Sequence, residues 1–289
     1  DEFTTSHVRN YRAFLREDNH MATQVKVMQI IARMNVGGPA VIVAELMRGL
    51  DKSEFEQILV TGFCDENEAD YLDTVAKDIK ANHIAGLGRS VSLIADLKAL
   101  IGLVSLIRKY KPDVIHTHTA KAGVLGRLAS LLAGRGAVRV HTFHGHLLNG
   151  YFGSFKRLLV VIAERFLATI TRQFLAVGDK VREDLLEAGI GTKENFGLMP
   201  PGLEIDVLPL KAESKAFYAL SNNQLQCAFI GRVTQIKRPH RFLDVVSEIK
   251  KREVNLDFFI AGDGELLEVC KKRIAADELP VVVLGWQIN

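Results

Sequence analysis

Residues 25–50 read VKVMQIIARMNVGGPAVIVAELMRGL, which combines a strand pattern, a glycine turn and a helical pattern. The apolar run Val25–Ala32 is typical of a strand buried on both faces, and Pro39 suits the first turn of a helix over Ala40–Leu50. The alternation recurs along the chain, so we expect further strands at 57–61, 79–84, 113–116, 138–143, 174–177, 196–199, 226–230, 256–261 and 281–284, and further helices at 91–110, 121–132, 154–171, 180–187, 238–251 and 265–276. Alternation of this kind predicts an α/β fold, with mostly parallel sheets and helices on both faces.

A change of pattern divides the chain near residue 200. Pro200, Pro201 and Gly202 interrupt the alternation, and a polar, irregular stretch follows to about Gln224. Only three strands are expected after that point, which is few for an open parallel sheet, so the second domain is predicted to be incomplete. The expected parts are a polar N-terminal extension over 1–20, a first α/β domain over 21–200, a linker over 201–224 and a partial second α/β domain over 225–289.

Composition and charge exclude several classes of protein. Hydrophobic residues make up 48% of the 289 residues and charged residues 25%, which is typical of a globular protein with a substantial core. The net charge of +3 is too small to indicate nucleic-acid binding by itself. No stretch reaches the ~18 consecutive apolar residues that cross a bilayer. The polar segment 1–20 lacks the apolar core of a secretory signal, and three widely separated cysteines indicate reduced thiols, so a cytoplasmic location is expected.

The turn after the first strand contains two glycines. Gly37 and Gly38 allow the backbone to approach a ligand closely, and the helix that follows offers the N–H groups of its first turn to an anion. An ordinary tight turn between a strand and a helix explains the same residues equally well. The segment does not match the G-x-G-x-x-G fingerprint of dinucleotide-binding enzymes, which disfavours an oxidoreductase.

Histidines gather at the ends of two predicted strands. Asp113-Val-Ile-His-Thr-His118 ends one strand, and His141-Thr-Phe-His144-Gly-His146 ends the next. Ligands of open parallel sheets bind beyond the carboxyl ends of the strands, so the cluster predicts a binding site. Neutral imidazoles can hydrogen-bond hydroxyls and phosphates there, although some of these histidines are expected to satisfy buried backbone groups instead.

The His-x-His spacing also allows a zinc site as an alternative. No HExxH motif, carboxylate-rich cluster or Asp-x-Asp pair accompanies the histidines in the sequence. We therefore expect no metal.

Two loops of the second domain carry further candidate residues. Residues 231–240 read GRVTQIKRPH and place Arg232 and Lys237 between a strand and a helix. Two cations beside a helix N-terminus can hold a diphosphate, and a solvated basic loop is the alternative. The turn AGDGE at 261–265 contributes Gly262 and Gly264, which are a weak signal by themselves.

Taken together and in order, these segments resemble family 4 glycosyltransferases of the GT-B fold. The matching segments are MNVGGPAVIV, PDVIHTHTAKAGVLGRLA, VHTFHGH followed by GYF, AVGDKVREDLLEAGI, MPPGLE, FIGRVTQIKRPHRFLDV and FIAGDGELL, and they extend over nearly all of 25–285. The HTHTAKAG and HTFHGH segments are similar to bacterial members that build capsules, exopolysaccharides or O-antigens on a lipid carrier. The resemblance implies two Rossmann-like domains that face each other across a cleft, with the acceptor side in 21–200 and the donor side in 225–289.

The resemblance also implies how a donor would be held. Arg232 and Lys237 would bind the diphosphate of a nucleotide sugar, and His144 would contact the transferred sugar. The family retains the anomeric configuration and generally needs no divalent metal, because cations of the protein stabilise the departing diphosphate. No metal and no cofactor are therefore expected, since the nucleotide sugar is a substrate. The remaining candidates are Gly37 and Gly38 for the diphosphate or the acceptor, Gly262 and Gly264 for the nucleotide pocket, and His116 and His118 for the acceptor side.

The implied function is retaining transfer of a sugar from a nucleoside-diphosphate sugar, with a UDP-sugar favoured, to a glycan or lipid-linked acceptor in cell-surface polysaccharide synthesis. The family's Glu-x7-Glu motif lies beyond Asn289, so the chain is expected to be a fragment or a natural truncation. Two alternatives stay open. One is a non-catalytic nucleotide- or partner-binding remnant, and the other is a UDP-N-acetylglucosamine 2-epimerase, which shares the GT-B fold but needs a carboxylate constellation that this sequence does not show.

One helical segment also indicates a membrane contact. Gly150–Thr171 mixes aromatic and aliphatic residues with Lys156, Arg157 and Arg165. A basic amphipathic helix can lie on an anionic leaflet, where a lipid-linked acceptor would be found. An ordinary helix packed against the core of the first domain is the alternative, and we favour it. No feature indicates nucleic acid as a partner or sets the oligomeric state.

Overall fold

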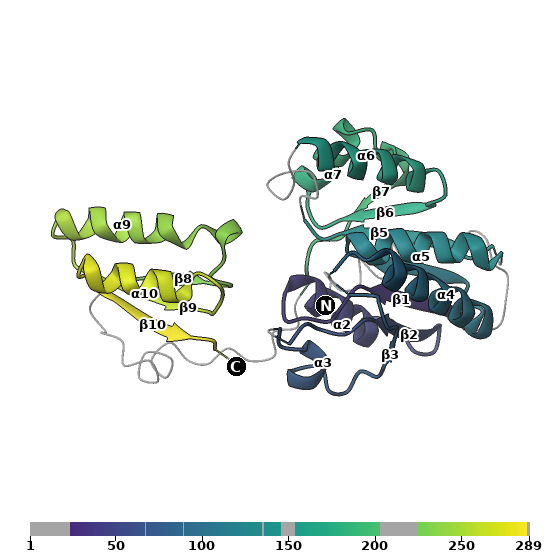
Figure 1. Cartoon of the computed structure of the whole chain (residues 1–289), viewed down its shortest axis with the longest axis horizontal. Helices are drawn as coiled ribbons and strands as arrows, with labels where there is room; N and C mark the ends of the chain where they lie inside the picture. The colour runs from purple at the N-terminus through teal and green to yellow at the C-terminus, as the bar shows by residue number, and fades with distance from the viewer. Residues whose placement is uncertain are drawn as a thin grey trace. The chain divides into compact units, whose positions relative to one another are not determined.

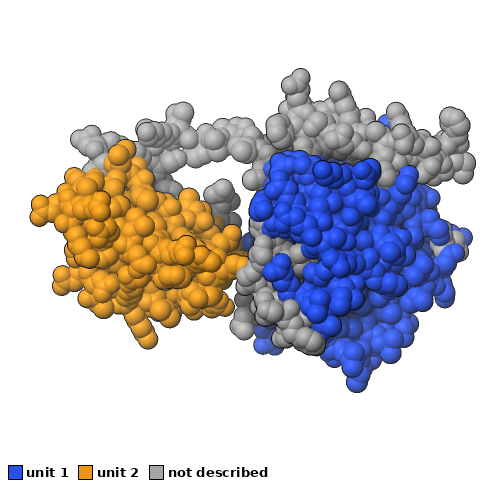
Figure 2. All heavy atoms as spheres, turned by 90° about the horizontal axis from the view of Figure 1, so that it is seen from above, with its two compact units in different colours: residues 1–204 blue, residues 205–289 orange. Residues whose placement is uncertain are grey.

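The computed structural model describes residues 24–66, 68–88, 90–134, 136–145, 154–202 and 225–287. The chain divides into two compact units, residues 1–204 and residues 205–289 (Figure 2). The expected extension 1–20 and most of the expected linker, residues 203–224, lie outside the described residues. Each unit has a parallel sheet of its own, so the predicted α/β class is confirmed.

Unit 1 is built on a sheet of seven parallel strands (Figure 1). The strand order β3-β2-β1-β4-β5-β6-β7 reverses between β1 and β4, because the chain first runs outward to β3 and then returns. The carboxyl ends of β1 and β4 therefore flank the point at which ligands of open parallel sheets bind. The strands are β1 (Val25–Ile31), β2 (Phe55–Thr61), β3 (Ala81–His83), β4 (Val114–His118), β5 (Val138–Phe143), β6 (Gln173–Ala176) and β7 (Phe196–Leu198).

Helices cover both faces of this sheet because successive strand residues point to opposite sides. Ile31 and Leu59 pack against α2 and α3, whereas Met28 and Ile30 pack against α4 and α5 on the other face. Figure 1 shows α4 and α5 side by side, and α6 follows in the same layer because Arg127 of α5 binds a carboxylate of α6. The helices are α2 (Gly38–Gly49), α3 (Tyr71–Thr74), α4 (Leu93–Tyr110), α5 (Ala120–Ala133), α6 (Ser154–Ala168) and α7 (Asp179–Glu187), with a short η1 (Lys193–Asn195).

Two glycines allow α5 to lie unusually close to the sheet. A Cβ atom at Gly123 would be 2.5 Å from Cε1 of His141, and one at Gly126 would be 2.6 Å from Cγ2 of Thr117. Neither distance is compatible with a Cβ atom unless the facing side chain of His141 or Thr117 moves. The glycines of the segment AKAGVLGR thus serve packing between helix and sheet.

Two differences between the structure and the predicted elements concern the region around the first sheet's histidines and the helix α3. The strand expected at 113–116 extends to His118, so the histidines of this segment belong to β4 itself. The short α3 was not predicted. It forms because Asp70 caps it, accepting a hydrogen bond from the backbone N–H of Leu72 at 2.8 Å, and because Tyr71 and Leu72 are buried.

Unit 2 contains a three-stranded parallel sheet of order β10-β9-β8. Both of its longer helices pack on one face, around the buried side chains of Leu243, Val246, Phe258 and Ile260. On the other face of β8, Ile230 is exposed. The elements are β8 (Leu225–Ile230), η2 (Gln235–Lys237), α9 (Pro239–Lys251), β9 (Leu256–Ala261), α10 (Leu267–Ala276) and β10 (Val281–Gly285).

Candidate functional site

The histidines of unit 1 are divided between the two faces of the sheet. Along β4, His116 and His118 point to the face that carries α2, and Thr117 points to the face that carries α5. The register pairs Thr117 with His141 of β5, so His141 lies on the α5 face. His144 follows directly after the end of β5. His146 lies outside the described residues.

His141 is enclosed beneath α5. Its Nδ1 lies 2.8 Å from Oγ1 of Thr117, and that hydroxyl donates its hydrogen to the carbonyl of Val140 at 3.2 Å. The hydrogen between the two side chains therefore belongs to Nδ1 of His141. Burial, followed by the charge of Arg127, holds the pKa of His141 well below its usual range. These contacts make His141 a structural residue, as was expected of some members of the cluster.

A buried ion pair supports this side of the sheet. Nη2 of Arg127 contacts both carboxylate oxygens of Glu164 on α6, at 2.8 and 2.9 Å, and both side chains are almost fully buried. Nε of Arg127 also donates to the carbonyl of Gly123 at 2.7 Å. The pair joins α5 to α6. Sequence reasoning missed it, because the two residues are 37 positions apart and each was counted only as part of a helix.

His116, His118 and His144 form a second group on the other face. Nδ1 of His118 lies 3.0 Å from Nε2 of His144, and the rings of His116 and His118 have centroids 4.1 Å apart. Nε2 of His116 lies 2.7 Å from Oγ1 of Thr142 on β5, and Nε2 of His118 lies 2.9 Å from Oε1 of Gln29 on β1. The structure thus brings together three of the predicted site residues.

Burial keeps these three imidazoles neutral. It lowers the pKa of His116 to about 3, with a further contribution from His144, and it lowers the pKa of His144 to about 4. The pKa of His118 lies well below its usual range for the same reason. Neutral imidazoles are hydrogen-bonding groups that carry no net charge toward a ligand. The group can therefore recognise hydroxyls but offers no cation to a phosphate.

The backbone at the carboxyl ends of β1 and β4 lies beside this group, since Ile31 pairs with His118 in the sheet. Gly37 and Gly38 begin α2, and a Cβ atom at Gly38 would meet no atom within 4 Å. The fold therefore does not require glycine at position 38, and the open space at this position allows the close approach of a ligand. This position fits an anion at a helix N-terminus.

Thr119 is a residue of this edge that sequence reasoning missed. It follows His118 and has a φ of 66°, which is uncommon for a residue with a side chain. Its Oγ1 accepts a hydrogen bond from the backbone N–H of Ala32 at 3.3 Å, so it ties the end of β1 to the start of α5. Strained backbone of this kind is concentrated at functional sites.

The candidate cations of unit 2 are exposed on one loop. Arg232 follows the end of β8, and Lys237 precedes α9, whose first residue is Pro239. The loop between them is held in place, because the N–H of Val233 donates to the carbonyl of Asp263 at 2.8 Å and the N–H of Gln235 donates to Oε1 of Glu265. Oγ1 of Thr234 is buried and has no hydrogen-bond partner among the described residues. The loop therefore presents Arg232, Lys237 and the neighbouring Arg238 from a fixed backbone, and it encloses one hydroxyl that has no partner among the described residues.

Gly262 and Gly264 have a structural reason for being glycine. Both have positive φ values, 144° and 152°. A Cβ atom at Gly262 would be 2.0 Å from the carbonyl oxygen of Gly231, and one at Gly264 would be 2.6 Å from that of Val233. The two glycines thus allow the loops after β8 and β9 to pack together. They shape the loop that carries the cations, whatever further part they take in binding a nucleotide.

No metal-binding group was found in the part of the chain that the structure describes. Across those residues, no three His, Cys, Asp or Glu side chains are grouped in a way that could hold an ion. The same residues contain no helix that is both long and apolar enough to cross a membrane.

The family model and the curated relatives that match this chain are all glycosyltransferases. The model of Glycosyltransferase Family 4 matches residues 36–207. A UDP-Gal:alpha-D-GlcNAc-diphosphoundecaprenol alpha-1,3-galactosyltransferase from Escherichia coli is 30% identical over 243 residues, which are 80% of this chain and 62% of that protein. The chain thus spans less than two thirds of the length of this curated relative.

Solved structures share the fold at low sequence identity. HepE from Anabaena, in complex with UDP-glucose, is 18% identical with a TM-score of 0.70, and the alignment covers 92% of this chain and 70% of HepE. A UDP-N-acetylglucosamine 2-epimerase is 14% identical with a TM-score of 0.61, and the alignment covers 92% of this chain and 70% of the epimerase. Because two different activities occur on this fold, the fold alone does not decide between them.

Proposed function

The chain belongs to glycosyltransferase family 4, and on this premise we propose that it transfers a sugar from a nucleoside-diphosphate sugar to a glycan or lipid-linked acceptor in cell-surface polysaccharide synthesis. We favour a UDP-sugar as donor and retention of the anomeric configuration. The Escherichia coli relative is named for UDP-Gal and for a diphosphoundecaprenol-linked acceptor, which supports a UDP-sugar and a lipid-linked acceptor here. A lipid-linked acceptor implies a cytoplasmic enzyme that acts at the inner face of a membrane.

The observation that carries this proposal is the cationic loop of unit 2. Arg232 and Lys237 project from a loop whose backbone is fixed by hydrogen bonds to the neighbouring loop, and both side chains are exposed. They would hold the donor diphosphate at the N-terminal end of α9, with Oγ1 of Thr234 as an additional hydrogen-bonding group. When the bond to the sugar breaks, negative charge grows on the diphosphate, and the two cations of this loop stabilise that charge. No metal is needed for this step.

The histidine group of unit 1 suits the sugar part of a ligand. His144 would contact hydroxyls of the transferred sugar, and His116 and His118 belong to the acceptor-side face as fully buried neighbours. The backbone at Gly37 and Gly38 would accommodate the diphosphate or the acceptor. Neutral imidazoles bind hydroxyls without attracting unrelated anions, which agrees with a division of labour between the two units.

Calorimetric titration with UDP and with GDP tests the donor site. We expect UDP to bind and the Lys237→Ala variant to bind it at least about tenfold more weakly, which corresponds to loss of one charge-assisted contact of about 1.4 kcal/mol. Lys272→Ala on α10 is the matched control, since it removes an exposed lysine elsewhere in unit 2. Equal binding by wild-type protein and Lys237→Ala, or no binding by folded protein, would contradict this donor site.

Two other activities make different predictions. A non-catalytic remnant would bind nucleotide and transfer no sugar to any acceptor. A UDP-N-acetylglucosamine 2-epimerase would interconvert its substrate without an acceptor, and the fold shared with such an epimerase is the observation in its favour. Incubation with radiolabelled UDP-sugars and a membrane extract separates the three, because only the transferase moves label into lipid.

A further inference from the structure

The outer surface of the helix layer α4–α5–α6 of unit 1 is rich in exposed apolar side chains. α4 buries Ala99, Leu103 and Ile107 against the sheet, and its opposite side faces solvent. That side and the outer side of α6 carry apolar residues that are each more than half exposed: Leu93, Ile94, Leu97 and Ile101 on α4, and Leu158, Leu159, Ile162 and Phe166 on α6. So many apolar side chains on one layer mark an interaction surface.

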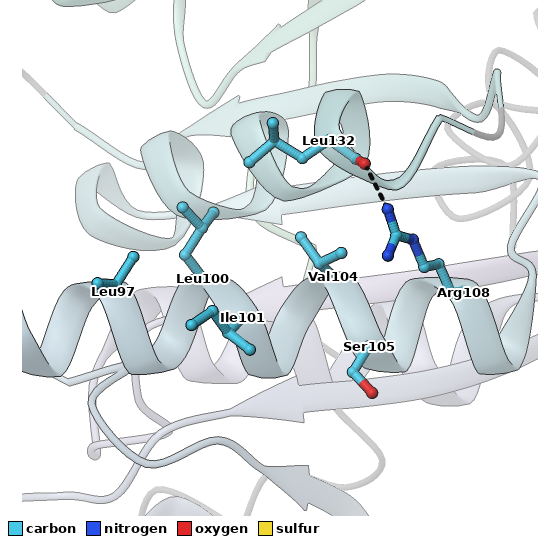
Figure 3. Close-up of a pocket in the computed structure, with 7 residues that line it drawn as sticks. All are labelled: Leu97, Leu100, Ile101, Val104, Ser105, Arg108 and Leu132. Atoms are coloured by element: carbon cyan, nitrogen blue, oxygen red, sulfur yellow. Dashed lines mark hydrogen bonds between the residues drawn. The ribbon is translucent and has the colours of Figure 1, made fainter.

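An open groove lies between α4 and α5 in this layer (Figure 3). It has a volume of about 540 Å³, and five aliphatic side chains line it, among them Leu97, Ile101 and Leu132. Arg108 lies at one end, where its Nη2 donates to the carbonyl of Leu132 at 3.1 Å. A groove with an aliphatic floor and a guanidinium at its edge suits a molecule with an apolar body and an anionic head.

The charges at this surface have one sign. Helices α4, α5 and α6 contain only two acidic residues, Asp96 and Glu164. Each is paired within the layer, Asp96 with Lys121 at 2.6 Å and Glu164 with Arg127 at 2.8 Å. The remaining basic residues of the three helices are Lys98, Arg108, Lys109, Lys156, Arg157 and Arg165. The side chains of Lys98, Arg108, Lys109, Arg157 and Arg165 are exposed.

We propose that the α4–α5–α6 layer docks on an anionic phospholipid membrane, with α4 as its main anchor. The apolar side chains enter the boundary between headgroups and acyl chains, and the surrounding cations attract anionic headgroups. The membrane contact that the sequence suggested for α6 thus becomes part of a surface of three helices. A second copy of the chain fits less well, because a symmetric contact would bring two basic surfaces together. The surface carries the proposal independently of sugar transfer, although a lipid-linked acceptor would give it a purpose.

Vesicle co-sedimentation tests this surface. The probes are vesicles of phosphatidylcholine with and without phosphatidylglycerol, and the variants are Leu97→Gln with Ile101→Gln, and Lys98→Glu with Lys109→Glu. We expect wild-type protein to prefer the anionic vesicles and each double variant to bind them at least tenfold more weakly. All four substituted side chains are largely exposed, so folding should be preserved. The matched control is Val75→Gln with Lys77→Glu, exposed residues beside α3 on the other face of the sheet.

Three results would overturn the docking surface. The first is binding of either double variant to anionic vesicles with wild-type affinity. The second is an equal loss of vesicle binding in the control variant. The third is self-association that depends on protein concentration and is abolished in the Leu97→Gln, Ile101→Gln variant while its vesicle binding is unchanged. UDP titration of the same variants distinguishes failure of the docking surface from failure of the proposed function. None of the substituted residues belongs to the cationic loop of unit 2, so UDP binding should be unchanged in these variants.

A second inference follows from the direction of the hydrogen bonds that lead to His144. Nε2 of Gln57 donates to the carbonyls of Leu46 and Met47 in the last turn of α2, each at 3.3 Å. Carbonyl oxygens only accept, so the orientation of the Gln57 amide is fixed and its Oε1 accepts from Nε2 of Gln29 at 3.2 Å. Oε1 of Gln29 then accepts from Nε2 of His118.

We infer that Gln29 and Gln57 are positioning residues that fix the tautomer of His144. Because Nε2 of His118 holds its hydrogen, its Nδ1 is an acceptor and must receive the hydrogen on Nε2 of His144. Nδ1 of His144 is thereby left as an acceptor, and it is buried without a hydrogen-bond partner among the described residues. It can take a hydroxyl or N–H donor of a ligand and cannot donate to a phosphate oxygen. That the donor is a sugar hydroxyl rests on the proposed function, whereas the tautomer does not.

Long-range ¹H–¹⁵N NMR of the histidine rings reads the tautomer directly. We expect His118 and His144 to carry hydrogen on Nε2 in wild-type protein, and Gln29→Met to convert both to mixtures of tautomers. Gln57→Met tests the same chain from a half-buried position if Gln29→Met does not fold. Gln173→Met on β6, whose Nε2 donates to the backbone carbonyl of Phe174, is the control. Hydrogen on Nδ1 of wild-type His144, or unchanged tautomers in a folded variant, would overturn the inference.

Discussion

The histidine group of unit 1 and the cationic loop of unit 2 both lie at the carboxyl ends of parallel strands, and they differ in burial, charge and hydrogen bonding. His116 and His118 are fully buried and neutral, and Nε2 of each faces a defined partner, Thr142 for His116 and Gln29 for His118. Arg232 and Lys237 are exposed, and only the backbone between them is fixed. Burial orients the ring nitrogens of the histidines but keeps the rings uncharged. Exposure to solvent leaves Arg232 and Lys237 charged, so they can bind an anion. The histidine group therefore suits uncharged hydroxyl groups, whereas the cationic loop suits an anion such as a diphosphate.

The largest expected effect concerns the buried ion pair behind the histidines. Replacing Arg127 by Met leaves the carboxylate of Glu164 buried without its partner, which should lower the free energy of unfolding of unit 1 by ~3–5 kcal/mol. Urea denaturation measures this loss of stability. In unit 2, Arg252 and its partner Glu248 are both exposed, so Arg252→Met should lower the free energy of unfolding by no more than about 1 kcal/mol.

The double variant Arg127→Met, Glu164→Met removes both charges and is the control for this comparison. It should recover most of the lost stability, because no uncompensated charge remains. If the single and the double variant were equally unstable, packing of the arginine side chain rather than charge would dominate at this position.

A pH titration of stability should separate the two regions next. Burial lowers the pKa of His116 to about 3 and that of His144 to about 4, below the unfolded value of 6.5. The unfolded chain therefore binds protons first as the pH falls. The stabilisation is fully present above pH 6.5 and is lost as the pH falls from 6.5 to about 3 for His116 and to about 4 for His144, by up to ~1.4 kcal/mol per pH unit for each histidine. Urea unfolding at several pH values, in wild-type protein and in His116→Asn, measures the contribution of His116. A slope that is identical in the two proteins would contradict it.

The sequence allowed the fold class to be predicted, because strand and helix patterns differ in period and glycine or proline marks most turns. It did not reveal which face of the sheet each histidine occupies. His116 and His118 could be assigned to one face by their spacing of two, but the position of His141 depends on the register between β4 and β5. Register is set by contacts between distant segments, which no local pattern records.

The same limit explains the other residues that were missed. Glu164 looked like one polar residue of an amphipathic helix until its contact with Arg127 was known. Gly262 and Gly264 remain candidates for a nucleotide pocket, but the sequence did not reveal their close approach to the loop after β8, which is a packing reason for glycine.

Glycine substitutions give a smaller effect that probes packing in both units. Gly123→Ala would place a Cβ atom 2.5 Å from His141, and Gly262→Ala would place one 2.0 Å from a backbone oxygen at positive φ. We expect each to lower the melting temperature, with ~1–3 kcal/mol lost. Gly123→Ala should also shift the imidazole resonances of His141, and Gly262→Ala should leave them unchanged. The reverse pattern in NMR spectra would show that the two units do not behave independently.

The smallest expected effect on stability is that of Gly38→Ala, and it is the most informative about ligand binding. No atom lies within 4 Å of the position that the new Cβ would occupy, and residue 38 stands at the start of α2. The free energy of unfolding should therefore change by no more than about 0.5 kcal/mol. If the backbone at Gly38 approaches a ligand as proposed, the same methyl group should weaken binding of a UDP-sugar in calorimetry. Unchanged stability together with unchanged binding would assign Gly37 and Gly38 to an ordinary turn and leave recognition in unit 1 to the histidine group alone.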